Sequence, residues 1–324
     1  MARILTGVQS TGIPHLGNML GAIIPAIQMA ENSNNESYLF IADLHSLTQI
    51  KDPKELKYNT LTTAAAWLAC GLDTSKTVFY RQSDVCQTTE LSWYLQCFFP
   101  YQRLTLAHSF KDKSNTVEQV NSGLFNYPLL MAADILLYDA DIVPVGKDQI
   151  QHIEITRDVA NRLNHQMGST LIIPEARVVK DKQIVPGIDG QKMSKSKKNI
   201  ISVFEGTKTL QKQIMSIKTD SKGVNEPKDP DNCTVFNLYS LVENQKEIEA
   251  LKTQYISGSI GYGDAKKLLS QSLLKKFRKQ INRFHYFMNH QEEVESLLQQ
   301  GSSKARKVAN KTLGRVRQKL GYSS

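Results

Sequence analysis

Roughly the first 200 residues alternate short β-rich runs with helical stretches, and this alternation restricts the fold more than any other feature. Such a β-α-β-α-β order is typical of a parallel sheet with helices on both faces. Pro25 predicts a kink in the first helix, and Gly71 is a suitable end for the second. The expected strands are 4–7, 38–42, 77–80 and 142–146, and the expected helices are about 16–31, 53–70 and 148–163. We therefore expect an α/β protein with a doubly wound parallel sheet.

Beyond about residue 200 helical patterns dominate. The expected helices are 205–217, 234–243, 245–257, 265–288, 291–300 and 304–320, with a polar, proline-containing loop at 220–232. The simplest division is a first domain over 1–200 and an all-helical C-terminal domain over 201–324. The last helix, about 303–324, could pack back on the first domain.

Positive charge is concentrated at the C-terminal end. The chain has 40 Lys and Arg against 31 Asp and Glu, a net charge of +9. From Lys266 onward, 14 basic residues stand against three acidic ones, so the rest of the chain is close to neutral. This asymmetry is expected of a surface that binds a polyanion such as nucleic acid. A solvated helical face is the structural alternative.

Composition argues against several other classes of protein. No apolar run approaches the roughly 20 residues that span a bilayer, and the N-terminus lacks signal-peptide features, so we expect a cytoplasmic protein. The cysteines are Cys70, Cys86, Cys97 and Cys233. None forms a C-x-x-C pair or has a histidine at metal-ligand spacing, so we expect reduced thiols and neither a zinc site nor disulfides.

A glycine-containing loop, Gly7 to Asn18, follows the first expected strand and opens the first helix. Free backbone N–H groups at such a helix start can face an anion, and Gly12 and Gly17 would let a ligand come close. The loop matches neither common phosphate-binding fingerprint. An ordinary capped helix start is the alternative. Side-chain donors in the loop are Gln9, Ser10, Thr11, His15 and Asn18.

A second polar motif, Lys192-Met193-Ser194-Lys195-Ser196, follows a stretch rich in proline and glycine. Lysines that close over a triphosphate can stabilise the charge that builds on a departing pyrophosphate. A mobile loop would also admit the nucleotide and release the product. A solvated turn is the structural alternative for the isolated motif.

Together these motifs resemble the two signatures of class I aminoacyl-tRNA synthetases. His15-Leu16-Gly17-Asn18 is similar to the His-Ile-Gly-His signature, with the Asn usual in the tryptophan and tyrosine branch, and residues 192–196 match the lysine loop letter for letter. The resemblance implies a Rossmann-like ATP-binding domain. It also implies catalytic roles for Gln9, Lys111, Lys192 and Lys195.

One carboxylate interrupts an otherwise apolar helical run, Tyr127 to Tyr138. Asp134 lies three residues after Met131, so both lie on one helical face. A buried carboxylate is costly without a partner, and an ion pair with Lys or Arg is the structural alternative. In the functional interpretation Asp134 accepts the polar hydrogen of an aromatic substrate, and the indole N–H of tryptophan fits this best.

Residues 131–136 and 143–154 closely resemble the tryptophanyl-tRNA synthetases of bacteria, and the similarity covers nearly the whole chain. It implies a tryptophan site at Gly7, Tyr127, Met131, Asp134, Val143, Val145 and Gln149. It implies an ATP site at Gln9, Ser10, Thr11, His15, Gly17, Asn18, Gly146, Lys147, Asp148, Ile184, Lys192, Met193, Ser194, Lys195 and Ser196. Lys147 stands where many relatives carry Glu, so only its backbone is carried over. His45 is placed either at the rim of the site or as a structural histidine.

The resemblance implies ATP-dependent attachment of L-tryptophan to tRNA(Trp) through an adenylate, with release of AMP and pyrophosphate. Mg²⁺ would travel on the ATP phosphates, with no protein-bound metal, and the enzyme would be a homodimer whose helical domain binds the anticodon arm. Two alternatives remain at this point: a tyrosine enzyme of the same fold, and a non-catalytic RNA-binding or regulatory paralogue. The intact motifs disfavour the paralogue, and Asp134 favours tryptophan.

Overall fold

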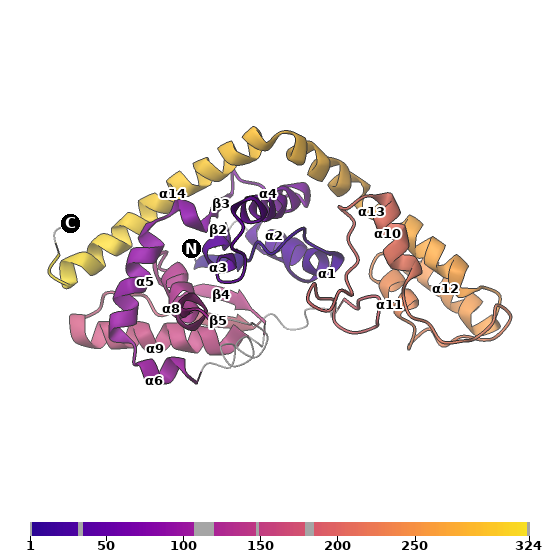
Figure 1. The fold of residues 1–324 in the computed structure, drawn as a ribbon, viewed down its shortest axis with the longest axis horizontal. Coiled ribbons are helices and arrows are strands. Elements are labelled where there is room, and N and C mark those ends of the chain that lie inside the picture. The colour runs from indigo at the N-terminus through magenta and orange to yellow at the C-terminus, as the bar shows by residue number, and fades with distance from the viewer. Residues whose placement is uncertain (1, 32–34, 107–119, 147–148, 179–184, 323–324) are drawn as a thin grey trace.

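The computed structural model describes residues 2–31, 35–106, 120–146, 149–178 and 185–322. At its centre is a five-stranded sheet, in which every neighbouring pair is parallel and the order is β3-β2-β1-β4-β5 (Figure 1). The strands are β1 (Ala2–Val8), β2 (Asn35–Ile41), β3 (Thr77–Arg81), β4 (Ile142–Val145) and β5 (Glu175–Val178). The predicted α/β class with a doubly wound parallel sheet is confirmed. Strand β5 was not predicted, because its short sequence has no apolar run.

Helices cover both faces of the sheet, because β2 alternates its side chains between two cores. Leu39 and Ile41 join one core, and Tyr38 and Phe40 join the other. The first core contains residues of α1 (Leu16–Asn18), η1 (Met19–Ile23), α2 (Ile24–Ala30) and α4 (Pro53–Ala69). The second contains residues of α5 (Gln87–Phe98), α8 (Ser122–Leu136) and α9 (Ile150–Met167). Two short helices, α3 (Asp43–Ser46) and α6 (Tyr101–Leu104), follow β2 and α5.

The first helical stretch contains a π-helical turn, η1, directly before Pro25. Proline cannot donate a backbone hydrogen bond, and the wider turn ahead of it marks where the regular ladder is interrupted. The sequence predicted a kink at Pro25, and the structure has a change of helix type, from η1 to α2, next to this residue.

Strands β1 and β4 diverge toward their carboxyl ends. The β1–β2 ladder continues from Ala2↔Asn35 to Val8↔Ile41, whereas β1 and β4 are paired in register at Ile4↔Ile142 alone. Strand order reverses between these two strands. In open α/β sheets, ligands bind in the crevice at this point.

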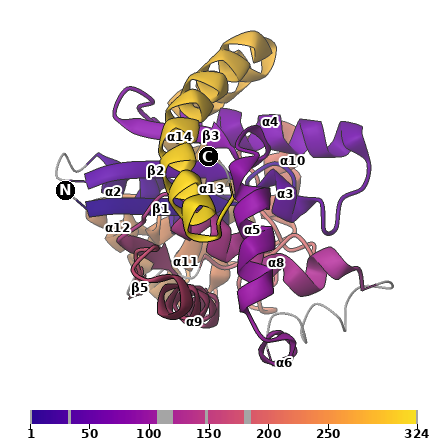
Figure 2. The same cartoon turned by 90° about the vertical axis from the view of Figure 1, so that its left-hand side faces the viewer.

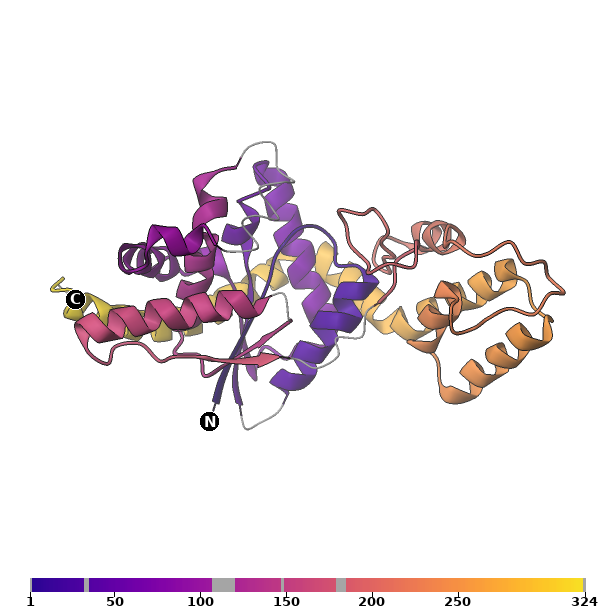
Figure 3. The same cartoon turned by 90° about the horizontal axis from the view of Figure 1, so that it is seen from below.

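The remaining helices are α10 (Thr207–Met215), α11 (Thr234–Ser240), α12 (Gln245–Ser257), α13 (Tyr262–Asn289) and α14 (Gln291–Lys319). Helices α10 to α12 form a lobe at one end of the molecule, and α13 leads back from that lobe to the sheet (Figures 1 and 3). The most extensive packing contacts between the two regions are α13 on α4 and α14 on β3. Among the described residues, no helix is long and apolar enough to cross a membrane.

Helix α14 is continuous, so the prediction of separate helices at 291–300 and 304–320 was wrong (Figure 2). Gly301 lies where α14 crosses β3. A Cβ atom there would lie 1.7 Å from the carbonyl oxygen of Phe79. The glycine therefore permits close packing of helix on strand, rather than ending the helix.

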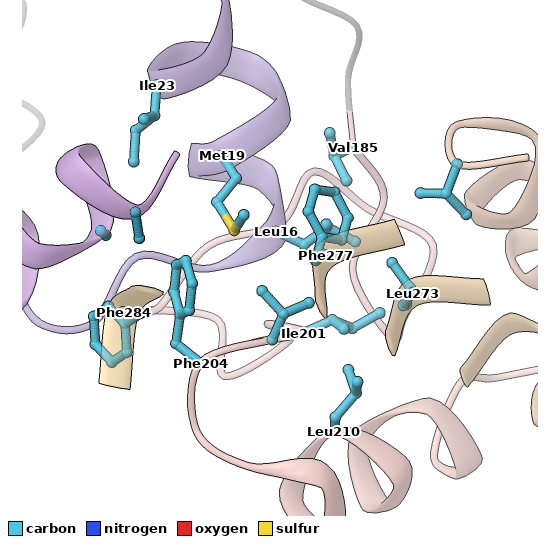
Figure 4. Packing of buried hydrophobic residues seen from close by; sticks show 14 of the residues in the cluster. Leu16, Met19, Ile23, Val185, Ile201, Phe204, Leu210, Leu273, Phe277 and Phe284 are labelled. Atoms are coloured by element: carbon cyan, nitrogen blue, oxygen red, sulfur yellow. The ribbon is translucent and has the colours of Figure 1, made fainter. Parts of the chain in front are cut away.

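One core joins the N-terminal helix to the segment after the lysine loop and to α13 (Figure 4). The backbone N–H of Leu16 donates to the carbonyl of Ile201 at 2.8 Å. The rings of Phe204 and Phe284 are stacked with centroids 4.4 Å apart. The two signature motifs are thus fixed to the same packed body.

Candidate active site

A cavity of about 780 Å³ lies at the carboxyl ends of β1 and β4, where the strand order reverses. Predicted site residues that line it are Gly7, Gln9, Thr11, Asn18, Tyr127, Met131, Asp134, Val143, Val145, Gly146 and Gln149. Sequence reasoning missed other lining residues, among them Leu20, Gly21, Ala22, Pro25, Ala26, Met29, Phe40 and Trp67. The π-helical turn η1 supplies three of them, and such turns are frequent at functional sites.

Asp134 lies at the cavity wall and is 2% exposed. The amide nitrogen of Gln82 lies 2.8 Å from each of its carboxylate oxygens, and Nε2 of His45 lies 3.0 Å from Oδ2. Burial raises the pKa of Asp134, and the hydrogen bonds from His45 and Gln82 oppose that rise. Its partners are an amide and an imidazole rather than the Lys or Arg of the structural alternative. His45 itself lines the cavity.

The ring of Phe40 packs closely on β1 at the cavity. A Cβ atom on Gly7 would lie 2.5 Å from Cζ of Phe40. A side chain at this point of β1 would therefore displace a ring that also lines the cavity. The Tyr127 hydroxyl lies 2.9 Å from Nε2 of His152, and this contact holds the Tyr127 ring, which also lines the cavity.

His15 and Asn18 cap the start of α1 reciprocally. The backbone N–H of Asn18 donates to Nδ1 of His15 at 3.2 Å, and the N–H of His15 donates to Oδ1 of Asn18 at 3.1 Å. This arrangement fixes the helix start that borders the cavity. Ser10 has a different position: it is fully buried, bonded to Ser46, and does not line the cavity.

The lysine loop contacts the N-terminal loop. The backbone N–H of Gly17 lies 3.4 Å from the sulfur of Met193, and Nζ of Lys195 donates to the carbonyl of Thr11 at 3.1 Å. The five residues of the lysine loop do not line the cavity themselves. Because Thr11 does, Lys195 reaches the cavity's rim.

Asn199 organises the lysine loop, although the sequence analysis did not single it out. It is 2% exposed, and its Oδ1 accepts from the N–H of Ser194 at 2.7 Å. Its amide donates to Oδ1 of Asp189 at 2.8 Å and to the carbonyl of Lys192 at 3.2 Å. This side chain therefore replaces a regular backbone ladder in the loop.

Where the two motifs meet, the pKa values of two ionisable side chains are lowered. Burial, reinforced by the nearby Lys195 ammonium, lowers the pKa of His15 to about 4. Burial lowers the pKa of Lys195 to about 8, against the opposing charge of Glu205. Near pH 7, His15 is therefore neutral and able to accept its capping bond, whereas Lys195 is mostly charged.

Four predicted site residues, Lys111, Lys147, Asp148 and Ile184, lie outside the described residues. Within the described ranges, no group of three or more His, Cys, Asp or Glu side chains could hold a metal ion. All four cysteines are free thiols.

Comparison with known proteins identifies the family. A family model described as tRNA synthetases class I (W and Y) matches residues 1–278. The chain belongs to this family.

Its class I relatives include proteins of nearly equal length. A protein of Campylobacter jejuni named tryptophan–tRNA ligase is 42% identical over 319 residues, which are 98% of this chain and 99% of the relative. One of the same name from Neisseria meningitidis is 40% identical over 328 residues, 98% and 97% of the two chains. A crystal structure of the Campylobacter jejuni tryptophanyl-tRNA synthetase complexed with ADP and tryptophan has a TM-score of 0.95, at 42% identity, covering 98% and 99% of the two chains. The predicted family is confirmed.

Proposed function

We propose that this chain attaches L-tryptophan to tRNA(Trp), using ATP and releasing AMP and pyrophosphate. The observation that carries this function is one cavity that is lined both by Asp134 and by the N-terminal loop, whose Thr11 carbonyl Lys195 contacts. An amino acid held at Asp134 and a nucleotide held at this loop would share the crevice at the carboxyl edge of the sheet.

In the first step the carboxylate of tryptophan attacks the α-phosphorus of ATP. A bond forms between a carboxylate oxygen and phosphorus, the bond to the bridging oxygen breaks, and pyrophosphate leaves with the electron pair. Because the carboxylate is already ionised, the reaction needs no general base from the protein. Catalysis then depends on positioning and on stabilising the charge that develops on the leaving group.

We assign that stabilisation to the lysine loop and the loop after β1. Lys195 already contacts Thr11 at the cavity rim, and exposed Lys192 lies on the same loop. Gln9 lines the cavity where the reacting groups would meet. Lys111 is assigned a phosphate contact by resemblance alone. Mg²⁺ would be carried by the phosphate oxygens of ATP, which are the hard ligands that it prefers.

Selection of tryptophan over tyrosine follows from Asp134 and the slot around it. An indole offers one N–H donor and no acceptor, so a carboxylate satisfies it fully. Phenylalanine has no polar hydrogen to donate to Asp134. Tyrosine can donate its hydroxyl, but this group projects from a six-membered ring and not from the edge of a bicyclic ring, so the shape of the site must reject it. Met131, Val143 and Val145 supply the apolar wall.

In the second step a ribose hydroxyl of the terminal adenosine of tRNA attacks the carbonyl of tryptophanyl-adenylate, and AMP leaves. We propose that residues 201–324 bind the anticodon arm, with helix α14 held on the first domain. In support, two of its arginines pair with that domain: Arg315 with Asp139 and Arg317 with Glu90. On α13, positive charge that could face RNA is exposed at Lys275, Arg278, Lys279 and Arg283.

We further propose a cytoplasmic homodimer. Three large apolar side chains near α5 and α6 support a second copy of this chain as the occupant of that surface: Trp93, Tyr101 and Leu106 are 63%, 66% and 61% exposed. Contiguous exposed apolar surface is a feature of interfaces between protein chains. Sedimentation or light scattering should give twice the monomer mass, and a charged substitution at Trp93 should reduce it. The cytoplasmic location is proposed because a tRNA ligase acts where translation takes place.

The test is amino-acid-dependent ATP–pyrophosphate exchange with all twenty substrates. Tryptophan alone should support rapid exchange, and Lys195→Ala should slow it by about 100-fold. Lys197→Ala, on the exposed side of the same loop, is the matched control. Nearly unchanged exchange in Lys195→Ala would contradict the charge-stabilising role, and faster exchange with tyrosine would contradict the substrate.

A further inference from the structure

Gln82 is a buried polar residue directly behind the proposed specificity carboxylate. It begins the short η2 helix (Gln82–Asp84) after β3 and is fully buried. Its amide nitrogen lies 2.8 Å from both oxygens of Asp134, and its Oε1 accepts from the N–H of Leu44 at 3.2 Å. Gln82 does not line the cavity, so any effect on the substrate must pass through Asp134.

The turn that carries Gln82 is held from both sides. On one side the N–H of Ser83 donates to Oδ1 of Asp43 at 3.0 Å. On the other, Ser302 of α14 donates to Oδ2 of Asp84 at 3.0 Å, and the guanidinium of Arg306 donates to the Asp84 carbonyl at 2.8 Å. A side chain anchored on such a turn keeps one orientation.

The two carboxylate oxygens of Asp134 accept different numbers of hydrogen bonds. Oδ2 accepts from both the His45 imidazole and the Gln82 amide, whereas Oδ1 accepts from the Gln82 amide alone. An ionised carboxylate has about four acceptor positions, so Oδ1 retains capacity for another donor. Because Asp134 lines the cavity, that donor can be part of a bound ligand.

We infer that Gln82 is a specificity-determining positioning residue, which holds Asp134 as an ionised acceptor with Oδ1 available to the indole N–H of the substrate. This inference rests on the proposed function. Without the amide, Asp134 would be free to turn away or to become protonated. A protonated carboxyl can present an O–H to the slot, where it would face the indole N–H donor to donor.

The surroundings of Asp134 make this support necessary. Burial and the charge of Asp43 favour the protonated form, and only His45 and Gln82 donate to the carboxylate among its described partners. The hydroxyl groups of Tyr80 and Tyr138 also lie near enough for Asp134 to affect their pKa values, which burial raises. Loss of the Gln82 amide would therefore raise the pKa of Asp134 further.

The experiment compares L-tryptophan with β-(3-benzothienyl)alanine, which has the same bicyclic shape but a sulfur atom in place of the N–H. Pyrophosphate exchange gives kcat/KM for both substrates in the wild type and in Gln82→Leu. We expect the preference for tryptophan to fall by about 10-fold or more, because the orienting bond to a buried charge is lost. The KM for ATP should stay within about twofold.

A pH profile supplies a measurement that a merely structural role would not move. Tryptophan binding should fail as pH drops through the pKa of Asp134. In Gln82→Leu this failure should begin at a higher pH than in the wild type, because the carboxylate has lost a donor that favours its ionised form. Thr63→Val is the matched control: Thr63 is 1% exposed and its hydroxyl donates to the Asn59 carbonyl at 2.7 Å, and neither His45 nor Gln82, the donors to Asp134, bonds to it. Thr63→Val should change neither the preference for tryptophan over the benzothienyl analogue nor the pH profile of tryptophan binding.

Each result decides the inference. Equal losses of kcat/KM for both substrates, or an unchanged preference, would overturn it. If Gln82→Leu fails to fold, Gln82→Asn shortens the side chain by one methylene and should reduce the preference to a smaller extent; an unchanged preference there also overturns it. Failure of the wild type to activate tryptophan would instead refute the proposed function.

Discussion

The ammonium group of Lys195 donates a 3.1 Å hydrogen bond to the backbone carbonyl of Thr11, which lies 184 positions earlier in the chain. Gly12 makes room for this contact: its φ is +113°, and a Cβ atom there would lie 3.0 Å from Nζ. The two signature loops are therefore already in contact in the folded chain. The cation that would stabilise a leaving phosphate is placed at the rim of the cavity by the fold itself.

The lowered pKa of Lys195 makes activation sensitive to alkaline pH. Because burial brings this pKa to about 8, the ammonium form is lost as pH rises through that value. We predict that kcat/KM for ATP in tryptophan-dependent exchange is level near pH 7 and falls roughly tenfold per pH unit well above pH 8. Lys195→Arg keeps its charge over this range and should flatten the profile. A wild-type profile that is flat to pH 10 would contradict the prediction.

His15 makes stability sensitive to acid. An imidazole in the unfolded chain titrates near pH 6.5, whereas that of folded His15 has a pKa of about 4. Between these values the unfolded state binds more protons, so this stabilisation is complete above about pH 7 and is lost as pH falls. Allowing for solvent screening, we expect about 1 kcal/mol between pH 7 and 5. His15→Asn keeps a capping acceptor but does not titrate. In chemical unfolding experiments its free energy of unfolding should therefore fall less steeply as pH drops.

The strands and motifs could be predicted from sequence because their signals are local. Apolar runs such as Tyr38 to Ala42 and the spacing of the two signatures are visible along the chain. Gln82 and Phe40 give no such signal, because their importance depends on neighbours from other strands and helices. Gly301 led to a wrong prediction. A glycine in a helical run can mark either the end of the helix or a close approach of another backbone, and only the position of the Phe79 carbonyl in the folded chain shows that it is the second.

The amide of Asn199 should be necessary for the geometry of the lysine loop. In the wild type the Asn199 amide lies 2.8 Å from Oδ1 of Asp189. In Asn199→Asp a second carboxylate would replace this donor and repel Asp189. We expect exchange activity to fall by about 10-fold, with a smaller loss in Asn199→Ala, which adds no repulsion. Asn232→Asp is a matched control, because Asn232 also donates to an aspartate, Asp229 at 2.6 Å, and neither residue of that pair bonds to the lysine loop in the described structure. Comparable losses in Asn232→Asp and Asn199→Asp would refute the positioning role.

Two glycines of α14 should respond oppositely to alanine. At Gly301 a Cβ atom would meet the Phe79 carbonyl oxygen at 1.7 Å, so helix and strand must separate, and we expect a loss of about 2–4 kcal/mol in unfolding free energy. At Gly314 nothing lies within 4 Å of an added Cβ, and its helical backbone suits alanine, so Gly314→Ala should gain about 0.5–1 kcal/mol. Urea unfolding of the two variants beside the wild type measures both values. A Gly301→Ala protein as stable as the wild type would mean that α14 does not cross β3 at this residue.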